Sequence, residues 1–213
     1  KNYAIYTHPL LLNDSTIIAD KSGMDDIDRF VLIDRKTGKE RTLLTPGFHI
    51  SGTTSLGGDW LVWSEAEPDR RWANRNYAEI RMYNFKTGKI HELTDETRYF
   101  APIISPDGTR VAAVFVSPEN QCSIDILEVP SGRIIKHYPV PDFGLAITPN
   151  WSPDATRIIF TLLTARGENI AVLDTATGKI QNMLPWTYNE INGLVFFYKH
   201  YIIYSMDYSG VEN

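Results

Sequence analysis

The six residues Ser105-Pro-Asp-Gly-Thr-Arg110 lead into the run Val111-Ala-Ala-Val-Phe115, and this stretch decides the fold of the chain. The same pattern returns 47 residues later as Ser152-Pro-Asp-Ala-Thr-Arg157, followed by Ile158-Ile-Phe-Thr-Leu162. Proline presets φ for a tight turn, and Asp and Gly complete that turn. The β-branched and aromatic runs that follow are typical of strands. Each copy therefore predicts a turn that leads into a β-strand.

A second repeated pattern follows these strands at a constant phase. An apolar strand leads into a turn in which Ser or Thr precedes a glycine and a basic residue follows it, with the glycines at Gly38, Gly88, Gly132 and Gly178. These glycines are 50, 44 and 46 residues apart. Asp34, Asn84 and Asp174 each precede a glycine by four residues and can accept backbone N–H groups in the turn, while glycine supplies a positive φ. The pattern predicts a hairpin turn.

The two patterns together predict repeated units of four short strands. Four-stranded units with a period of roughly 40–50 residues are typical of β-propeller blades. In the third unit we expect strands over 99–104, 110–116, 123–129 and 133–138. We place the units at 1–46, 47–96, 97–141, 142–186 and 187–213, the last one incomplete. The sequence therefore predicts an all-β chain, a β-propeller of four-stranded antiparallel blades with about four and a half blades present, as part of a larger propeller.

The repeat resembles that of a known group of propellers. The Ser-Pro-Asp-Gly-Thr-Arg turn, its strand and the Asp-x-x-Thr-Gly-Lys turn look like the WD40-like Pro-Asp repeat of TolB-like propellers. Similar repeats occur in the propellers of prolyl oligopeptidase and dipeptidyl peptidase relatives and of tricorn-type proteases. The resemblance implies a protein of the bacterial cell envelope, periplasmic or exported. Because one fold hosts many functions, the motif predicts the fold and leaves the function open.

Composition and motifs argue against several classes of function. The net charge of −5 differs from the basic character of duplex nucleic-acid binders, and no apolar run approaches the length of a membrane span. The single Cys122 excludes an internal disulfide framework, and we expect it to be an inert, part-buried thiol. The five histidines form no His-x-x-x-His pair, and the acidic cluster at 25–28 lacks the spacing of a calcium loop. We predict no metal or cofactor, while a calcium ion held in a propeller channel by several blades stays open.

The sequence also lacks the motifs of nucleophilic catalysis. A hydrolase nucleophile elbow needs Gly-x-Ser-x-Gly, and the stretch Gly52-Thr-Thr-Ser-Leu-Gly57 has the wrong spacing. Lys36-Thr-Gly38 matches the Lys-Thr-Gly motif of β-lactamases, but the sequence lacks the Ser-x-x-Lys motif that accompanies it in those enzymes. We therefore expect no catalytic residue in this chain and no enzyme activity from it alone.

One segment departs from the repeat and carries the candidate binding residues. The second unit holds an insertion at 66–76 that contains Arg70, Arg71, Trp72 and Arg75. Arg and Trp are enriched at interface hot spots, and loops on rigid scaffolds often carry function. The alternative is structural: Trp72 packs over the neighbouring blade, and the arginines pair with acidic residues at 65, 67 and 69.

These observations favour a non-enzymatic scaffold that binds a protein or peptide partner. Two other functions stay open. The chain is alternatively the gating propeller of a larger prolyl oligopeptidase-type serine peptidase, or a carbohydrate-binding propeller that uses Trp151 or Trp186. An incomplete propeller would expose strand edges and half a core, so we also expect further blades, a partner chain or a second copy to cover them.

Overall fold

The computed structural model describes residues 3–24, 26–50, 52–68, 76–198, 201–208 and 211–212. In these residues the strands form five antiparallel sheets, four with four strands and the last with three. The one helical element described is a 3-10 turn, η1 (Pro141–Phe143). No helix in the described part of the chain has the length and hydropathy needed to cross a bilayer. The predicted all-β fold of four-stranded units is confirmed.

The sheets follow one another along the chain, and we call them blades 1 to 5. Blade 1 contains β1 (Ala4–Asn13), β2 (Thr16–Gly23), β3 (Asp26–Asp34) and β4 (Glu40–Leu44). Blade 2 contains β5 (Ser55–Gly57), β6 (Trp60–Pro68), β7 (Asn76–Asn84) and β8 (Lys89–Glu92). Blade 3 contains β9 (Tyr99–Ile104), β10 (Arg110–Val116), β11 (Cys122–Glu128) and β12 (Ile134–Pro139). Blade 4 contains β13 (Leu145–Trp151), β14 (Arg157–Thr164), β15 (Gly167–Asp174) and β16 (Ile180–Asn182), and blade 5 contains β17 (Ile191–Tyr198), β18 (Tyr201–Tyr208) and β19 (Val211–Glu212).

Blade 3 matches its predicted strands to within one residue at each end, because its turns use the hydrogen bonds that the sequence suggests. The Asp107 carboxylate accepts the backbone N–H and the hydroxyl of Thr109 at 3.1 and 2.9 Å. The Ser105 hydroxyl accepts the N–H of Arg110 at 3.0 Å, which closes the turn just before β10. At the other turn, Gly132 has a φ of +69°, and an added Cβ would lie 2.1 Å from the Leu93 carbonyl oxygen. Only glycine fits that position.

The core lies between neighbouring blades. Alternate side chains of a strand point to opposite faces of the sheet, so each blade buries one set against the preceding blade and the other against the following one. Between blades 3 and 4, Ile124 and Ile126 pack with Ile158, Phe160 and Leu173, and all five are almost fully buried. Burying a side chain of this size contributes about 1.5–3 kcal/mol. The blades therefore stabilise one another through their faces.

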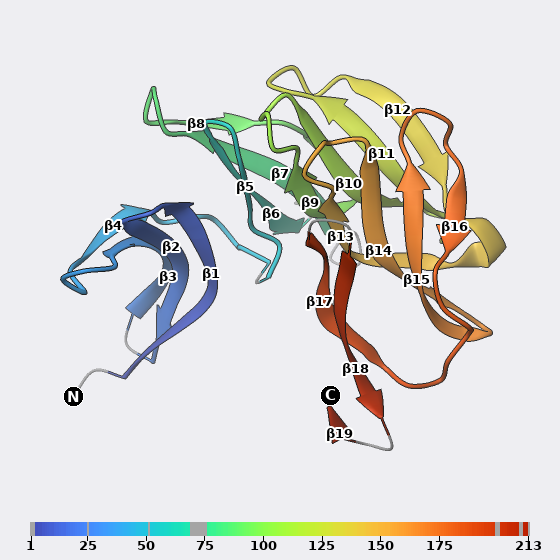
Figure 1. The fold of residues 1–213 in the computed structure, drawn as a ribbon. Helices are drawn as coiled ribbons and strands as arrows, with labels where there is room; N and C mark the ends of the chain where they lie inside the picture. Colours follow the sequence, from blue (N-terminus) through green and yellow to red (C-terminus); the bar gives the residue numbers. More distant parts are fainter. Residues whose placement is uncertain are drawn as a thin grey trace.

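The five blades fan out into an open arc (Figure 1), with the first strands β1, β9, β13 and β17 nearest its centre. Blades 1 and 5 face each other across the open side. Leu11 of blade 1 is 59% exposed, whereas Ile104, its counterpart in blade 3, is 3% exposed against blade 2. The exposed Tyr201 and Ile203 lie on β18 of blade 5. The arc therefore corresponds to part of a propeller ring, as predicted.

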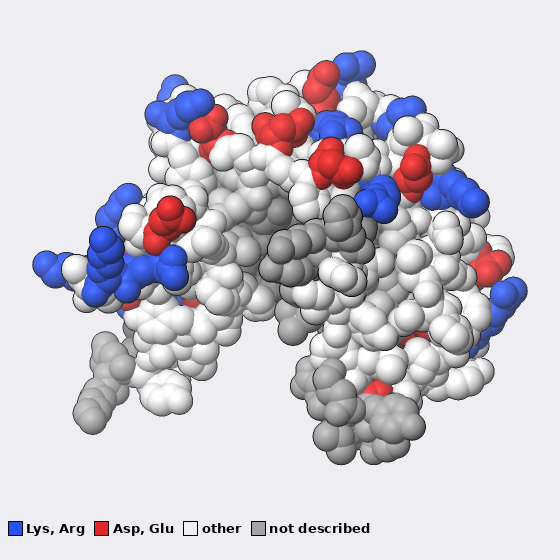
Figure 2. All heavy atoms as spheres, viewed as in Figure 1, with Lys and Arg blue, Asp and Glu red and all other residues white. Residues whose placement is uncertain are grey.

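Charged side chains follow the outer margin of this arc, and few of them lie toward its open side (Figure 2). Several belong to the hairpin turns between third and fourth strands. There Asp34 accepts the N–H groups of Lys36 and Thr37 at 3.0 and 2.7 Å, and Asp174 accepts the equivalent N–H groups of Ala176 and Thr177 in blade 4. These hydrogen bonds lower the pKa of both carboxyls. The charged turns thus serve the fold.

Candidate functional site

The connections between strands lie on two opposite faces of the arc, because successive antiparallel strands end at opposite edges of a blade. First-to-second-strand turns meet on one face, where Gly58 N–H donates to the Pro106 carbonyl at 3.1 Å. Connections from second to third strands, and from blade to blade, meet on the other face, where Val116 N–H donates to the Arg98 carbonyl at 3.3 Å. We call the second surface the loop face. Among the described residues it comprises 24, 26–27, 46–50, 52–54, 66–68, 94–98, 117–121, 140–144, 164–167 and 185–190.

The loop face carries several of the most exposed large apolar side chains in the described residues. Phe48, Phe143 and Tyr188 are 77%, 86% and 88% exposed, and Met24 is also almost fully exposed. All of them lie in connections outside the repeats, so the repeat pattern predicted nothing about them. A large apolar residue in a connection with no counterpart in the other units was the signal that could have revealed them. Exposed aromatic residues gathered on one face are typical of an interaction surface.

The connection from blade 3 to blade 4 holds its aromatic residue outward at a cost. Asp142 and Phe143 have φ values of 58° and 51°, which is the left-handed region. A non-glycine residue in that region costs on the order of 1–3 kcal/mol of conformational energy, and the conformation persists only where the surrounding structure holds it. The Asp142 carboxylate lies 3.7 Å from Arg166 Nη2 of the neighbouring connection. This strained turn presents the Phe143 ring on the loop face.

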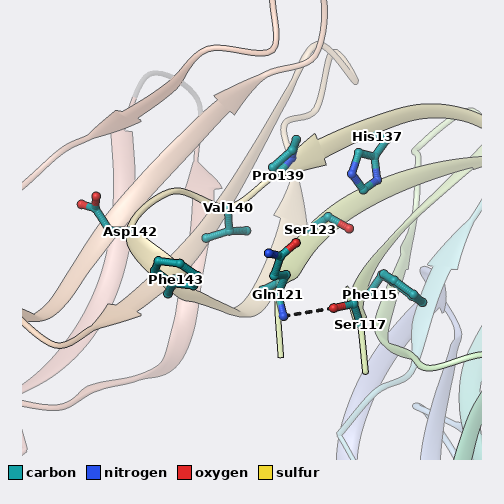
Figure 3. A pocket seen from close by; sticks show the side chains of 10 residues that line it. Phe115, Ser117, Gln121, Ser123, His137, Pro139, Val140, Asp142 and Phe143 are labelled. Atoms are coloured by element: carbon teal, nitrogen blue, oxygen red, sulfur yellow. Dashed lines mark hydrogen bonds between the residues drawn. The ribbon is translucent and has the colours of Figure 1, made fainter. Parts of the chain in front are cut away.

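A cavity of 510 Å³ opens on the loop face beside Phe143, with residues from β10, β11, β12 and η1 around it. Figure 3 shows Phe143, Val140 and Pro139 along one side and His137 and Phe115 along the other, with Gln121 and Ser123 between them. The remaining lining residues are Ser117, Cys122 and Asp142. Aromatic walls with a few polar groups between them are typical of ligand and side-chain pockets.

A buried carboxylate lies behind this pocket. Asp125, on β11, accepts hydrogen bonds from Tyr99 Oη at 2.9 Å, from Ser123 Oγ at 2.9 Å and from His137 Nδ1 at 2.7 Å. The Asp125 side chain is 5% exposed and that of His137 is 58% exposed. Burial, together with the adjacent Asp125 carboxylate, raises the pKa of the Tyr99 hydroxyl. The Asp125 carboxylate therefore holds the His137 ring in one orientation at the edge of the pocket.

The predicted binding residues Arg70, Arg71, Trp72 and Arg75 lie outside the described residues. In the sequence they stand between β6, which ends at Pro68, and β7, which begins at Asn76. Two of the acidic residues that the sequence offered as partners for these arginines, Glu65 and Glu67, lie 3.6 Å from the guanidinium of Arg81.

Arg81 is the centre of a charge cluster in blade 2. Its guanidinium also contacts Glu79 at 2.7 Å and Glu92. Burial raises the pKa of the Glu79 carboxyl. Carboxylate oxygens of Glu79, Glu92 and Asp95 lie within 4.8 Å of one another, a spacing that suits a cation. Arg81 already supplies the positive charge between Glu79 and Glu92, so this is a cluster with its own counter-ion.

A second hollow lies on the inner side of the arc, where the first strands of four blades meet. It has a volume of 430 Å³ and is lined by residues of β1, β9, β13 and the segment 52–56. The inner strands bulge at equivalent points, where His8, Ala101 and Thr148 have φ values of 45–49°. A proline follows each of these residues. The repeated X-Pro upstream of the turns is therefore the sequence signal for these bulges.

The other predicted residues have structural surroundings. Cys122 is buried, and burial raises the pKa of its thiol, which agrees with the expected inert thiol. Trp151 and Trp186 both pack against the core between blades 3 and 4. The Trp151 indole donates to the Ile103 carbonyl at 3.1 Å, and the Arg110 guanidinium lies 5.1 Å from its ring. Both tryptophans thus contribute to the packing between blades.

Comparisons with known proteins agree with this architecture. No protein-family model and no curated protein matches the sequence. The chain is similar to TolB from Acinetobacter baumannii, with a TM-score of 0.64, 14% identity, and coverage of 92% of this chain and 49% of that one. It is similar to the β-propeller domain of the trilobed protease from Pyrococcus furiosus, with a TM-score of 0.57, 14% identity, and coverage of 99% and 70%. It is similar to oligogalacturonate lyase from Vibrio parahaemolyticus, with a TM-score of 0.58, 14% identity, and coverage of 84% and 53%.

The chain therefore spans about half the length of the TolB structure that it matches. At 14% identity these similarities describe the fold and leave the activity open. Sheet order, inter-blade packing and structural neighbours all agree that this chain is an arc of β-propeller blades of the kind found in TolB.

Proposed function

We propose that this chain is a non-enzymatic scaffold that binds a protein or peptide partner through its loop face. The observation that carries the proposal is the exposure of Phe48, Phe143 and Tyr188 on that one face. Aromatic side chains are enriched in the buried cores of protein interfaces and often dominate the binding energy. We propose the inserted Arg70, Arg71, Trp72 and Arg75, which stand between β6 and β7 in the sequence, as part of the same surface. The resemblance to TolB-like repeats supports a location in the bacterial periplasm or cell envelope.

The opposite face supports this choice of surface. The polar side chains of its turns already hydrogen-bond within the turn. The carboxylates of Asp107 and Asp154, for example, accept hydrogen bonds from the hydroxyls of neighbouring Ser and Thr residues. A carboxylate that is already saturated by its own turn has little capacity left for a partner. The loop face instead combines exposed rings with a cavity of 510 Å³.

A selection from a random dodecapeptide display library tests the proposal. We expect the full chain to enrich peptides whose affinity falls at least tenfold for the double variant Phe48→Ser, Tyr188→Ser. The matched control is Ile90→Ser, which changes an exposed apolar residue on β8, near the opposite face, and should leave the affinity unchanged. Failure to enrich any peptide, or equal affinity for the loop-face variant, would contradict the proposal.

The gating propeller of a larger peptidase remains the second candidate, because one observation favours it. The chain is similar to an acylaminoacyl peptidase over 95% of its own length and 35% of that protein, with a TM-score of 0.58 and 10% identity. In that case the partner surface would face a hydrolase domain of the same protein. Sequencing the reading frame downstream of residue 213 separates the two, since a nucleophile elbow there would favour the peptidase and further propeller repeats would favour the scaffold.

A further inference from the structure

Blades 1 and 2 meet along a seam that the chain itself crosses. The connection from β4 to β5 lies between the two blades (Figure 1), and part of it pairs with the end of β6. Ala66 N–H donates to the Phe48 carbonyl at 2.8 Å. Ile50 N–H donates to the Ser64 carbonyl at 2.9 Å. The backbone of His49, between Phe48 and Ile50, is therefore fixed to blade 2.

The side chain of His49 packs against blade 1. Its ring meets the buried Phe30 ring of β3 edge-on, with the two centroids 4.9 Å apart. Phe30 in turn contacts the Trp63 ring of β6 at 5.4 Å, within the apolar cluster between the two blades. His49 Nε2 lies 3.3 Å from the Thr54 hydroxyl. The part-buried imidazole thus joins blade 2 to blade 1 at the edge of their shared core.

Four titratable groups interact with His49, one from each strand packed around it: His8 on β1, Asp20 on β2, Asp28 on β3 and Glu65 on β6. The three carboxylates attract a proton on His49, and His8 repels it. Asp20 Oδ2 already lies 3.0 Å from His8 Nδ1. Burial outweighs the attraction, so the pKa of His49 lies below its usual value of 6.5. The seam therefore encloses an uncharged imidazole at neutral pH.

An imidazole that is neutral in the closed seam takes up a proton more readily when the seam opens to water. Its contribution to closure is complete well above pH 6.5 and is lost as the pH falls below that value. At pH 5.5 a solvated imidazole is protonated about ten times more often than it is neutral, so opening becomes at most about tenfold more favourable. Asp20 acts in the opposite sense, because burial raises the pKa of its carboxyl from 3.8. The usual value for His is the higher of the two, so the effect of His49 comes first as the pH falls.

We propose that His49 makes the seam between blades 1 and 2 a pH-sensitive joint, in which mild acidification loosens the hold of blade 1 on blade 2. The joint divides the loop face, because the exposed Met24 belongs to blade 1 and the exposed Phe48 is bound to β6. Loosening the seam would therefore displace one apolar residue of that surface relative to the other. Where the joint concerns partner binding, the inference rests on the proposed function.

Thiol labelling of the full chain measures the opening of this seam without any partner. In a Cys122→Ala background, Leu61→Cys places a thiol in the seam, since Leu61 is fully buried toward blade 1. Val62→Cys is the matched control, because Val62 is the next residue of β6, is equally buried and faces blade 3. Labelling rates with a maleimide are corrected by the rate of free cysteine at the same pH. From pH 7.5 to pH 5.5 we expect a rise of about three- to tenfold for Leu61→Cys and no change for Val62→Cys.

Two variants of the labelled protein assign the effect to His49. His49→Gln keeps a side chain that can hydrogen-bond to Thr54 but cannot be protonated, so the rise should disappear. His8→Gln is its matched control, because it removes the other imidazole at Asp20, and the rise should persist. Asp20→Asn tests the joint with His49 in place. It removes both an attraction for the proton and the opposing effect of Asp20, so the rise should be at least as large as in the original protein.

A labelling rate of Leu61→Cys that is independent of pH, or equal rises for the two thiols, would overturn the joint. A rise that survives His49→Gln, or disappears in His8→Gln or Asp20→Asn, would overturn the role of His49. The outcome is separable from that of the scaffold proposal. Labelling independent of pH, with selected peptides that lose affinity in the Phe48, Tyr188 variant, would support the scaffold and overturn the joint. Labelling that rises with acidity without any enriched peptide would support the joint and overturn the scaffold.

Discussion

Replacing the polar cluster around Asp125 should show how much its hydrogen bonds contribute to the stability of the fold. Tyr99→Phe removes one of the three donors from a buried carboxylate. A hydrogen bond to a charged group contributes about 1.5–3 kcal/mol, so this single change should lower the free energy of unfolding by that amount. For a chain of this size the melting temperature should fall by about 3–12 °C.

An apolar replacement of the whole cluster should behave differently. The quadruple variant Tyr99→Phe, Ser123→Ala, Asp125→Val, His137→Thr leaves no buried charge and copies the Val31–Thr42 pair of blade 1. Exchanging a buried ionic group for apolar residues is often neutral or stabilising by about 1–4 kcal/mol. We therefore expect the quadruple variant to be at least as stable as the original protein.

Equilibrium urea unfolding, followed by tryptophan fluorescence, measures both effects. Tyr83→Phe is the matched control, because it removes a hydroxyl from a part-buried tyrosine of blade 2, and it should change the free energy of unfolding by less than about 0.5 kcal/mol. A quadruple variant less stable than the original by more than about 2 kcal/mol would refute the reasoning, since the cluster would then be a stabilising element of the fold.

Three further predictions concern the links between blades, the turns and the insertion. Asn169→Ala removes the two hydrogen bonds to the Leu184 backbone at 2.6 and 3.1 Å and should cost about 2–3 kcal/mol by urea unfolding, while the exposed Asn182→Ala should cost almost nothing; similar losses for both would contradict the view that Asn169 fixes the connection leading from blade 4 to blade 5. Hydrogen bonds from Ser152 and Thr156 lower the pKa of Asp154 from 3.8 to about 2, so its stabilisation is complete above pH 3.8 and is lost as the pH falls toward 2. Asp154→Asn should therefore be less stable at pH 7 and show a shallower decline of the urea midpoint between pH 4 and pH 2; parallel pH curves would disprove this. Trp72→Ala should weaken binding of selected peptides more than it lowers the melting temperature, and an unchanged affinity with a lower melting temperature would assign Trp72 a structural role.

Much of the fold follows from short-range sequence signals. The turns at Ser105 and Ser152 close through hydrogen bonds between residues at most five positions apart, so their residue types are sufficient to predict them. The strands after them are predicted because the side chains on both faces of a blade pack against neighbouring blades, which requires continuous β-branched and aromatic runs. These signals repeat with the blade period, which is why blade 3 was predicted to within one residue.

The residues of the candidate site could be predicted from the sequence only in part. The insertion with Trp72 departs from the repeat and could be found in the sequence, but Phe48, Phe143 and Tyr188 lie in connections of ordinary length. Nothing in their local sequence shows that they share a face. That information depends on how the blades are stacked, because blade-to-blade connections are brought to one edge only when the arc forms.

The sequence by itself therefore determined the blade repeat and its turns, because these depend on backbone conformation and on apolar runs within a few residues. Tertiary structure alone decided the environment of Asp125, whose three donors come from Tyr99, 26 positions away, from Ser123 on its own strand, and from His137 on the next strand. The cost of a buried charge is set by such neighbours. Only packed blades provide them, and the pocket beside His137 exists for the same physical reason.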